Sequence, residues 1–432
     1  MESAKQDFPN NCTGRMADTD TSPAGDASPR LSTSHGAFHD GTTEEQEIED
    51  TLGESLDSIL DISRWHEGVD LANLYGKLNQ AVAESVAQAD RTRAPLRQLL
   101  FEKLEEGAGQ GTAPDAAGLY GLTVADIKFV HRHLLFNGAT ECCDGTVVSH
   151  DSLLLTVAQI GVSLVAYQGN AGTWVQRLYR RDLTGQFADP MEEAIALLER
   201  RNRSESADAV ETRDPLSTLL RRGLMEYAER AVLLLNATAP WRMGHGNPVS
   251  AMLLMPLTPT LQRAGMEVTK QLLLEHRKFV YVASSPSNRL VRTLGDALNP
   301  LEYAIVGGMH DVVNVEKLTN IEAHGRPRRM RELRAFLNDL LPELVYGVFR
   351  VSEESPAQVF YAHKDEAHTA AAIAMADAAL QPHRGFPMLI DLADLVCRTT
   401  FDATSFAGTV GDAYSAAGYP LRYLGERETR GR

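Results

Sequence analysis

The apolar run from Leu153 to Tyr167 constrains the fold of this chain more than any other feature. It is too long for a short strand, and it fits a buried strand that the turn Gly169–Gly172 closes. A shorter apolar segment before it ends at Asp144 and is followed by Gly145, and the segment from Trp174 to Leu183 has the pattern of a hairpin partner. These segments predict neighbouring strands of one sheet.

Helical and strand patterns are mixed along the rest of the chain. Helices are predicted over 52–62, in a second stretch that ends near 105, over 122–135, 191–201 and 214–236, and from about 387 onward. Strands are predicted over 278–283, 344–351 and 357–361. The apolar end of the 214–236 segment, residues 231–235, fits a buried strand equally well. The mixture predicts an α/β fold, in which helices flank a mixed sheet.

Composition divides the 432 residues into a tail, an extension and a main domain. Residues 1–50 are rich in Ser, Thr, Asp, Gly and Pro, and a segment with so few large apolar side chains is expected to be disordered. Residues 51–106 form a predicted helical extension, which packs along the core or carries a dimer contact. A linker rich in Gly, Ala and Pro, residues 107–118, leads to the main domain over 119–432.

The chain is acidic, with 42 Lys and Arg against 58 Asp and Glu and a formal net charge of -16. Because such a surface repels nucleic acid as a whole, any DNA contact is expected in a local basic patch. The 4 cysteines lack the spacing of a metal site, and the sequence contains neither a targeting segment nor a run of about 18 apolar residues. We therefore expect a cytoplasmic protein with reduced thiols and no membrane contact.

Asp144 is the first candidate for chemistry. A carboxylate held at the edge of a sheet offers a rigid oxygen ligand to a hard divalent cation and leaves other coordination positions to water and phosphate. The Asp144–Gly145 pair is also the commonest short hairpin signal, so a plain turn is the alternative.

His245 is the second candidate, because it lies between Gly244 and Gly246. Glycines on both sides let the backbone approach a ligand closely, and the imidazole can bind a metal or donate to a phosphate. The alternative is a tight loop with an exposed histidine.

Basic residues are densest in the cluster Arg326, Arg328 and Arg329, and Arg289 follows a polar turn. Within an acidic chain, these four arginines are the predicted contacts to the nucleic-acid backbone. The alternative is a solvated helix start in which the cluster pairs with nearby acidic residues such as Glu332.

Three motifs follow one another along the chain. Asp144–Gly145–Thr146 ends the first apolar segment, a helix with an internal glutamate leads into a second apolar run, and Gly385 to Asp394 reads Gly-Phe-Pro-Met-Leu-Ile-Asp-Leu-Ala-Asp. This order resembles the NurA domain, a nuclease with an RNase H-like core. The resemblance covers roughly residue 52 to the C-terminus, and it implies an RNase H-like mixed sheet flanked by helices.

The resemblance also implies roles for individual residues. Asp144 matches the first metal ligand of the family, with Thr146 in place of a serine. The second carboxylate comes from the middle helix, where we prefer Glu226 to Glu229 because of its spacing to the following apolar run.

At three positions of these later motifs this chain differs from the family pattern. Asn236 occupies the third acidic position and offers only a neutral oxygen, and in the closing motif Phe386 replaces a tyrosine and Asp394 a histidine. Asp391 or Asp394 can supply a carboxylate instead, and His245 is the best replacement for the lost histidine. The predicted catalytic residues are Asp144, Glu226, Asp394 and His245, and the predicted metal ligands are Asp144, Glu226, Asn236 and Asp391.

Two functions follow from the resemblance. The first is a nuclease dependent on Mn²⁺ or Mg²⁺ that acts on DNA ends in double-strand break repair, as a homodimer docked on a HerA-type hexameric ATPase. The second is a catalytically inactive NurA-like module that binds DNA ends or the ATPase.

Overall fold

The computed structural model describes residues 49, 52–65, 71–111, 113–151, 155–181, 189, 191–193, 195, 218–254, 258–283, 289–319 and 327–419. The predicted disordered tail, apart from Glu49, lies outside these residues, as does Arg326. The chain divides into two compact units, 1–83 and 84–432. In the first, the described elements are helix α2 (Leu56–Leu60), the 3-10 turn η1 (Ile62–Arg64) and the first part of α3 (Leu71–Glu106).

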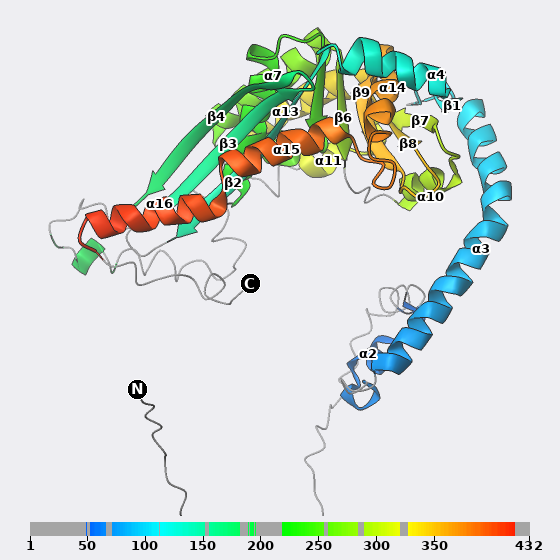
Figure 1. The fold of residues 1–432 in the computed structure, drawn as a ribbon, viewed down its shortest axis with the longest axis horizontal. Coiled ribbons are helices and arrows are strands. Elements are labelled where there is room, and N and C mark those ends of the chain that lie inside the picture. Colours follow the sequence, from blue (N-terminus) through cyan, green and yellow to red (C-terminus); the bar gives the residue numbers. More distant parts are fainter. Residues whose placement is uncertain are drawn as a thin grey trace, which may run out of the picture. The chain divides into compact units, whose positions relative to one another are not determined.

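A nine-stranded sheet forms the centre of the second unit, in the order β1-β7-β8-β9-β6-β5-β2-β3-β4 (Figure 1). Its strands are β1 (Gly118–Gly121), β2 (Thr140–Asp151), β3 (Thr156–Ala166), β4 (Gly169–Arg180), β5 (Trp241–His245), β6 (Phe279–Ala283), β7 (Glu302–Gly308), β8 (Leu344–Arg350) and β9 (Gln358–His363). The pairs β2–β5 and β5–β6 are parallel and the others are antiparallel. The sheet is therefore mixed, as predicted.

Helices cover both faces of this sheet. One apolar core lies beneath α7 (Thr218–Leu235) and α13 (Pro327–Leu340), and the other lies beneath α4 (Val124–Val130), α14 (Ala367–Ala378) and α15 (Met388–Thr400). The remaining elements are α8 (Ala251–Leu254), α9 (Pro259–Lys270), α10 (Arg289–Ala297), α11 (Val315–Leu318) and α16 (Ala403–Ala416), with the turns η3 (His131–Leu135), η4 (Gln271–His276), η5 (Met309–Asp311), η6 (Leu341–Glu343) and η7 (Lys364–Glu366). The α/β prediction is confirmed.

The predicted strands around Leu153–Tyr167 are confirmed as β3 and β4, and the later strand predictions as β6, β8 and β9. Asp144, however, neither ends a strand nor forms a turn, because β2 continues through it to Asp151. The alternative of a strand over 231–235 is also wrong, since these residues complete α7. The strands β1, β5 and β7 were not predicted. β1 and β5 have only four and five residues, and β7 ends in two glycines.

Two findings bear on the remaining sequence predictions. Among the described residues, the thiols of Cys142, Cys143 and Cys397 are free and buried. None of the described helices combines the length and the apolar character that crossing a bilayer requires.

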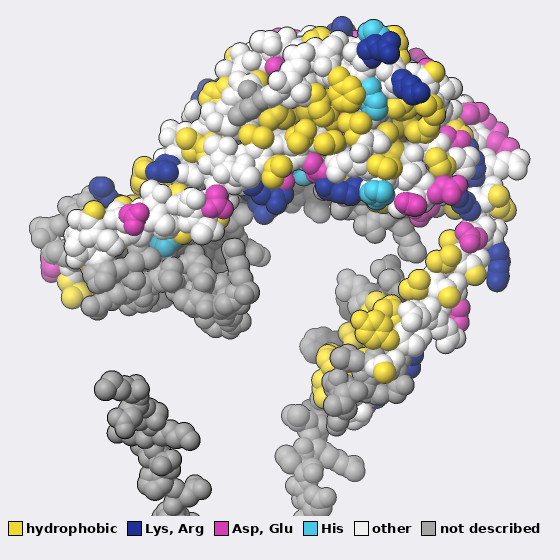
Figure 2. All heavy atoms as spheres, in the orientation of Figure 1, with side chains coloured by type: hydrophobic (Ala, Val, Ile, Leu, Met, Phe, Trp, Pro, Cys, Tyr) yellow, Lys and Arg dark blue, Asp and Glu magenta, His cyan; other side chains and the backbone are white. Residues whose placement is uncertain are grey.

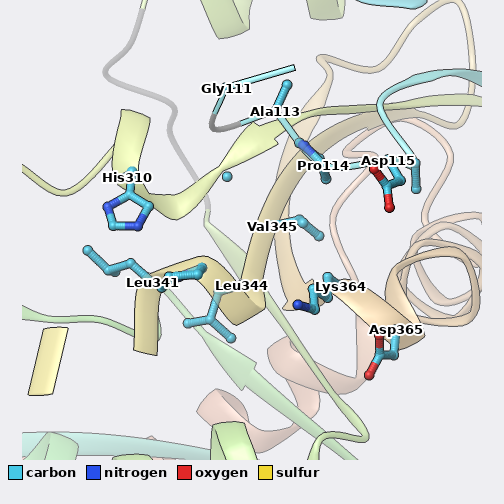
Figure 3. A pocket seen from close by; sticks show the side chains of 13 residues that line it. Gly111, Ala113, Pro114, Asp115, His310, Leu341, Leu344, Val345, Lys364 and Asp365 are labelled. Carbon is cyan, nitrogen blue, oxygen red and sulfur yellow. The ribbon is translucent and has the colours of Figure 1, made fainter. Parts of the chain in front are cut away.

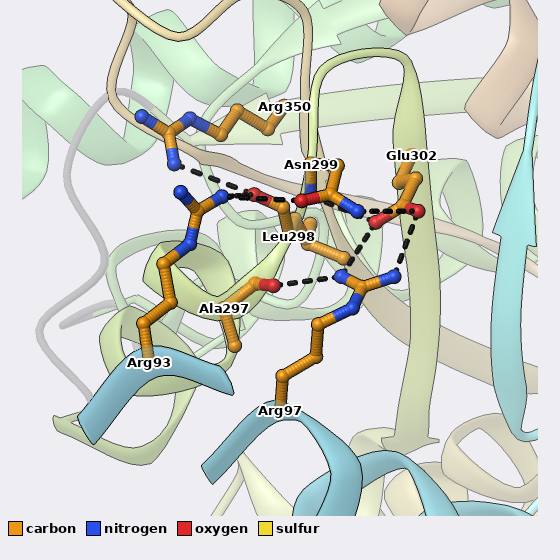
Figure 4. Close-up of polar contacts among 7 residues, drawn as sticks. All are labelled: Arg93, Arg97, Ala297, Leu298, Asn299, Glu302 and Arg350. Atoms are coloured by element: carbon orange, nitrogen blue, oxygen red, sulfur yellow. Dashed lines mark hydrogen bonds and ion pairs between the residues drawn. The ribbon is translucent and has the colours of Figure 1, made fainter. Parts of the chain in front are cut away.

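Within the second unit, two arginines anchor the C-terminal part of α3 to the turn before β7 (Figure 4). Arg97 donates to both carboxylate oxygens of Glu302 at 2.7 Å and to the Ala297 carbonyl at 2.7 Å, and Arg93 donates to the Leu298 carbonyl at 2.7 Å. A two-pronged arginine–carboxylate contact is among the stronger polar interactions in proteins. The helix is therefore held by directed hydrogen bonds as well as by apolar packing of Phe101.

Replacing Arg97 by Ala should destabilise the second unit by about 1–2 kcal/mol at pH 7, because the charged hydrogen bonds to Glu302 are lost. Burial raises the pKa of Glu302, but the hydrogen bonds from Arg97 and Asn299 outweigh it and lower the pKa below 4.5. A lowered carboxyl pKa contributes stability above the unfolded value, and this contribution is lost as pH falls through the folded pKa. The deficit, measured by urea unfolding, should therefore shrink in acid. Arg91→Ala, an exposed position on the same helix, is the control, and equal effects of the two variants would contradict the anchoring role.

Candidate active site

The site begins where β5 stops pairing with β2. The parallel register joins β2 to β5 from Thr140–Trp241 to Cys143–Gly244, and β5 ends one residue later at His245. From Asp144 onward β2 pairs with β3 and, among the described residues, with no second strand. Because parallel strands run in the same direction, His245 comes to lie beside Asp144, with 3.9 Å between His245 Nδ1 and Asp144 Oδ1.

Side chains alternate between the two faces of β2. Cys143 belongs to the core beneath α7 and Cys142 to the core beneath α15. By this alternation the Asp144 side chain lies on the α15 face, and position 145 faces α7. Ser163, which pairs with Asp144 across the β2–β3 ladder, donates its hydroxyl to the Ala393 carbonyl of α15 at 2.7 Å. Helix α15 therefore lies directly against this part of the sheet.

Glu229 of α7 reaches the site from the other face. Its carboxylate accepts a hydrogen bond from the Gly145 N–H, and a Cβ atom at position 145 would lie only 2.6 Å from Glu229 Oε1 and 2.7 Å from Met225 Cγ. Glycine is therefore required for this close approach. Burial, followed by the charge of Asp144, raises the pKa of Glu229 well above 4.5, and Arg230 offsets the shift in part.

Glu226, the preferred candidate from the sequence, lies one turn earlier on α7. Its Oε2 atom is 3.7 Å from Arg230 Nη1, and this buried oxygen has no hydrogen-bond partner within the described part of the chain. Both glutamates lie on the same helix, three residues apart, so sequence spacing alone could not decide between them. The contact with Gly145 makes Glu229 the glutamate next to Asp144 along β2.

Arg230 connects α7 to the loop that follows His245. Its side chain is buried, and its guanidinium donates to the carbonyls of Asn247 at 3.2 Å and Pro248 at 3.0 Å. It also lies 5.7 Å from the centre of the Tyr281 ring. These contacts fix the chain just beyond His245, and the sequence alone did not point to Arg230.

Helix α15 brings two carboxylates and an aromatic ring to the same region. The Phe386 ring, just before the helix, packs edge-on against His245 with 5.6 Å between ring centres. Asp394 pairs with Arg398, whose Nε lies 2.6 Å from Oδ1, and Asp391 accepts from Gln381 at 2.6 Å and from Arg384. Both aspartates are only partly exposed.

The charge of the site acts on His245. Contact with the Asp144 carboxylate raises the pKa of His245 above 6.5, burial opposes this, and the charges of Asp394 and Asp391 raise it further. At 3.9 Å the His245–Asp144 contact is an ion pair rather than a hydrogen bond. The structure thus places His245 beside Asp144, and it brings Glu229 to the neighbouring Gly145 from the opposite face of β2. Asp144 and Glu229 lie within electrostatic range of each other, as do His245 and the two aspartates of α15.

Other predicted residues do not join this group. Asn236 lies at the exposed C-terminal end of α7, about two turns beyond Glu229, so it is not brought to Asp144. Within the described residues, no three His, Cys, Asp or Glu side chains stand at metal-ligand spacing.

The predicted DNA-contacting arginines are dispersed. Arg328 pairs with Glu332 at 3.0 Å, as the solvated-helix alternative expects, and Arg329 donates to Gln262 at 2.8 Å. Arg289 begins α10, and its side chain is not described.

A cavity of about 560 Å³ lies apart from these residues (Figure 3). It is lined by polar groups that include Asp115, His310, Lys364 and Asp365, together with the apolar Leu341 and Leu344. None of the predicted site residues lines this cavity.

Comparison with known proteins was informative only at the level of structure. No family model matches the chain, and no curated protein matches it. Among solved structures, the NurA nuclease from Sulfolobus solfataricus is similar at a TM-score of 0.42 and 10% identity, over 82% of this chain and 99% of that one.

Two further structures illustrate the range of similarity. NurA bound to dAMP and manganese is similar at a TM-score of 0.34 and 8% identity, over 63% of this chain and 90% of that one. Endonuclease V from Ciona intestinalis, in complex with DNA, is similar at 0.24 and 13% identity, over 74% of this chain and 98% of that one. In each of these three comparisons the identity is between 8% and 13%.

Replacing Asp144 by Asn should lower the pKa of His245, because the variant removes the charge that favours the imidazolium. A raised histidine pKa contributes stability that is fully present below the unfolded value of 6.5 and is lost as pH rises through the folded pKa. The variant should therefore lose stability mainly at acidic pH. Titration of the His245 ring by NMR measures the shift, and Asp339→Asn on α13 is the control. An unchanged His245 titration in Asp144→Asn would refute the pairing.

Proposed function

We propose that this chain is a divalent-metal-dependent nuclease that hydrolyses phosphodiester bonds in DNA. The observation that carries the proposal is the pair of Asp144 and His245 at the open edge of β2, with Glu229 held at the next residue, Gly145. Two carboxylates and an imidazole, on the side of β2 where no second strand pairs among the described residues, can form a site for a cation and a phosphate together.

The donor set suits a hard cation such as Mg²⁺ or Mn²⁺. Asp144 and Glu229 would hold the ion, and sites for Mg²⁺ commonly use only one or two protein carboxylates, with substrate phosphate and water completing the coordination. Burial and, after it, the charge of Asp144 raise the pKa of Glu229, and a bound cation would offset both by favouring the charged carboxylate. When bound, the ion would activate water and stabilise the oxygen that leaves phosphorus.

His245 would supply the proton that this reaction requires. Hydrolysis adds water to phosphorus and breaks a P–O bond, so the departing oxygen must gain a proton. The Asp144 carboxylate raises the pKa of His245 and so favours its charged form, the His245 side chain is 38% exposed, and the Phe386 ring packs against it. A histidine with these properties fits the role of general acid at the departing oxygen.

Other residues of the chain would position these groups. Arg230 ties the helix that carries Glu229 to the loop after His245. Gly145 leaves the space in which the Glu229 carboxylate lies. Both act through their neighbours, and neither is expected to touch the substrate.

One observation favours the second candidate function, a catalytically inactive module that binds DNA ends. On α15, Asp394 pairs with Arg398 and Asp391 with Arg384, so part of the negative charge available for a cation is already neutralised. The finer expectations of action at DNA ends in double-strand break repair, a homodimer and a HerA-type ATPase partner come from the sequence resemblance, and we retain them as part of the proposal.

The assay of the proposal is cleavage of single-stranded and duplex DNA with Mn²⁺ or Mg²⁺. Asp144→Asn and Glu229→Gln should each lower the rate by at least about 100-fold, since each removes several kcal/mol of metal-assisted stabilisation. Glu226→Gln, on the same helix, is the matched control and should lose much less. Circular dichroism checks that each variant is folded. A wild-type protein that binds DNA but cleaves it with neither metal would instead support the binding module.

A further inference from the structure

Two pairs of aromatic rings, which we call the row, lie on α4 and η3, and each pair includes an exposed phenylalanine. Phe129 is 59% exposed and Phe136, directly after η3, is 46% exposed. Large apolar side chains of this size are normally buried, and a group of them on a surface indicates a binding site.

Neighbouring rings hold these phenylalanines in place. Phe129 lies 4.6 Å from His133 between ring centres, and Phe136 stacks on His131 at 5.1 Å with 25° between the planes. The edge of the Tyr167 ring contacts Phe136 at 5.1 Å, and His131 Nε2 is fixed 2.7 Å from the Ala376 carbonyl. The row is therefore ordered before any partner binds.

The surface around the rings is basic, although the chain is acidic. Lys128 and Arg132 are exposed, and so is His133. The single carboxylate on α4, Asp126, is engaged by the N-terminal cap of the helix at Thr123. Figure 2 shows Lys, Arg and His side chains beside the apolar patch over α4.

The row lies on the same face of the sheet as Asp144. The Thr140 hydroxyl donates to the Leu134 carbonyl of η3 at 2.6 Å, and Thr140 has the same alternation along β2 as Cys142 and Asp144. Four residues of a strand span about 13 Å, so a chain of a few nucleotides can reach from η3 to the candidate site.

We propose that Phe129, Phe136 and the histidines between them form a stacking platform for single-stranded nucleic acid. Every base has a face that stacks on an aromatic ring, and the cations beside the row can contact the backbone phosphates, so the platform would bind without sequence preference. The platform would guide a DNA strand into the candidate site, and this part of the proposal rests on the proposed function. A protein partner would need the apolar rings but not the flanking cations.

Binding of a fluorescent oligo-dT to the full chain tests the platform, measured by anisotropy in EDTA so that no cleavage occurs. Changing both Phe129 and Phe136 to Ala should weaken binding about tenfold or more, whereas changing both to Tyr should preserve it because the stacking face is kept. Tyr179→Ala removes an equally exposed ring from β4 and should have no effect. Changing Lys128 and Arg132 to Ala should flatten the salt dependence of binding.

Equal affinity of the double-Ala variant and the wild type would overturn the platform, as would an equal loss in Tyr179→Ala. A double-Ala variant that binds oligo-dT normally but changes its state of self-association would instead identify a protein interface. Asp144→Asn separates the two proposals, because it should keep oligo-dT affinity while losing cleavage. If the wild type cleaves DNA and the double-Ala variant still binds oligo-dT normally, the proposed function stands and the platform is refuted.

Discussion

The rest of this structure depends on where β5 leaves β2. Because β5 ends at His245, the edge of β2 is open from Asp144 onward, and groups from both faces of the sheet can meet there. Asp144 and His245 come from the sheet, Glu229 comes from α7 on one face, and the carboxylates of α15 come from the other. With one more pair in the β2–β5 ladder, the Gly145 N–H would bond to β5, and Glu229 would lose its partner.

The site concentrates charge at a cost to stability. A buried Glu229 next to Asp144 is unfavourable unless it is compensated, and the compensation here is partial: a hydrogen bond from Gly145 and the charge of the buried Arg230. The guanidinium of Arg230 donates hydrogen bonds to the loop after His245 and to the Glu226 carbonyl. Burial and the charge of Asp144 therefore disfavour the charged form of Glu229, and a divalent cation bound between the two carboxylates would offset both effects.

Sequence patterns predicted the parts of the fold in which one periodicity dominates. The buried, mostly apolar β3 and the start of α15 near Pro387 are examples, and Asp144 and His245 were found from their glycine neighbours. The strand β5 was not predicted because Arg242 interrupts its apolar pattern. In the structure this buried arginine caps the end of α7 by donating to the carbonyls of Leu233 and Ala237. These hydrogen bonds from Arg242 hold the apolar run 231–235 as the last turn of a helix. Asn236 therefore follows a helix and not a strand. The choice of Glu229 over Glu226 needs the position of Gly145, which only the fold supplies.

The central claim, that Asp144 and Glu229 together bind a divalent cation, is tested most directly by X-ray diffraction from crystals soaked in Mn²⁺, recorded so that manganese scatters anomalously. The account predicts an anomalous peak between the Asp144 and Glu229 carboxylates at the open edge of β2, and no such peak in crystals of Glu229→Gln. A saturating soak that leaves this position empty, or that places manganese only at carboxylates elsewhere on the chain, would contradict it.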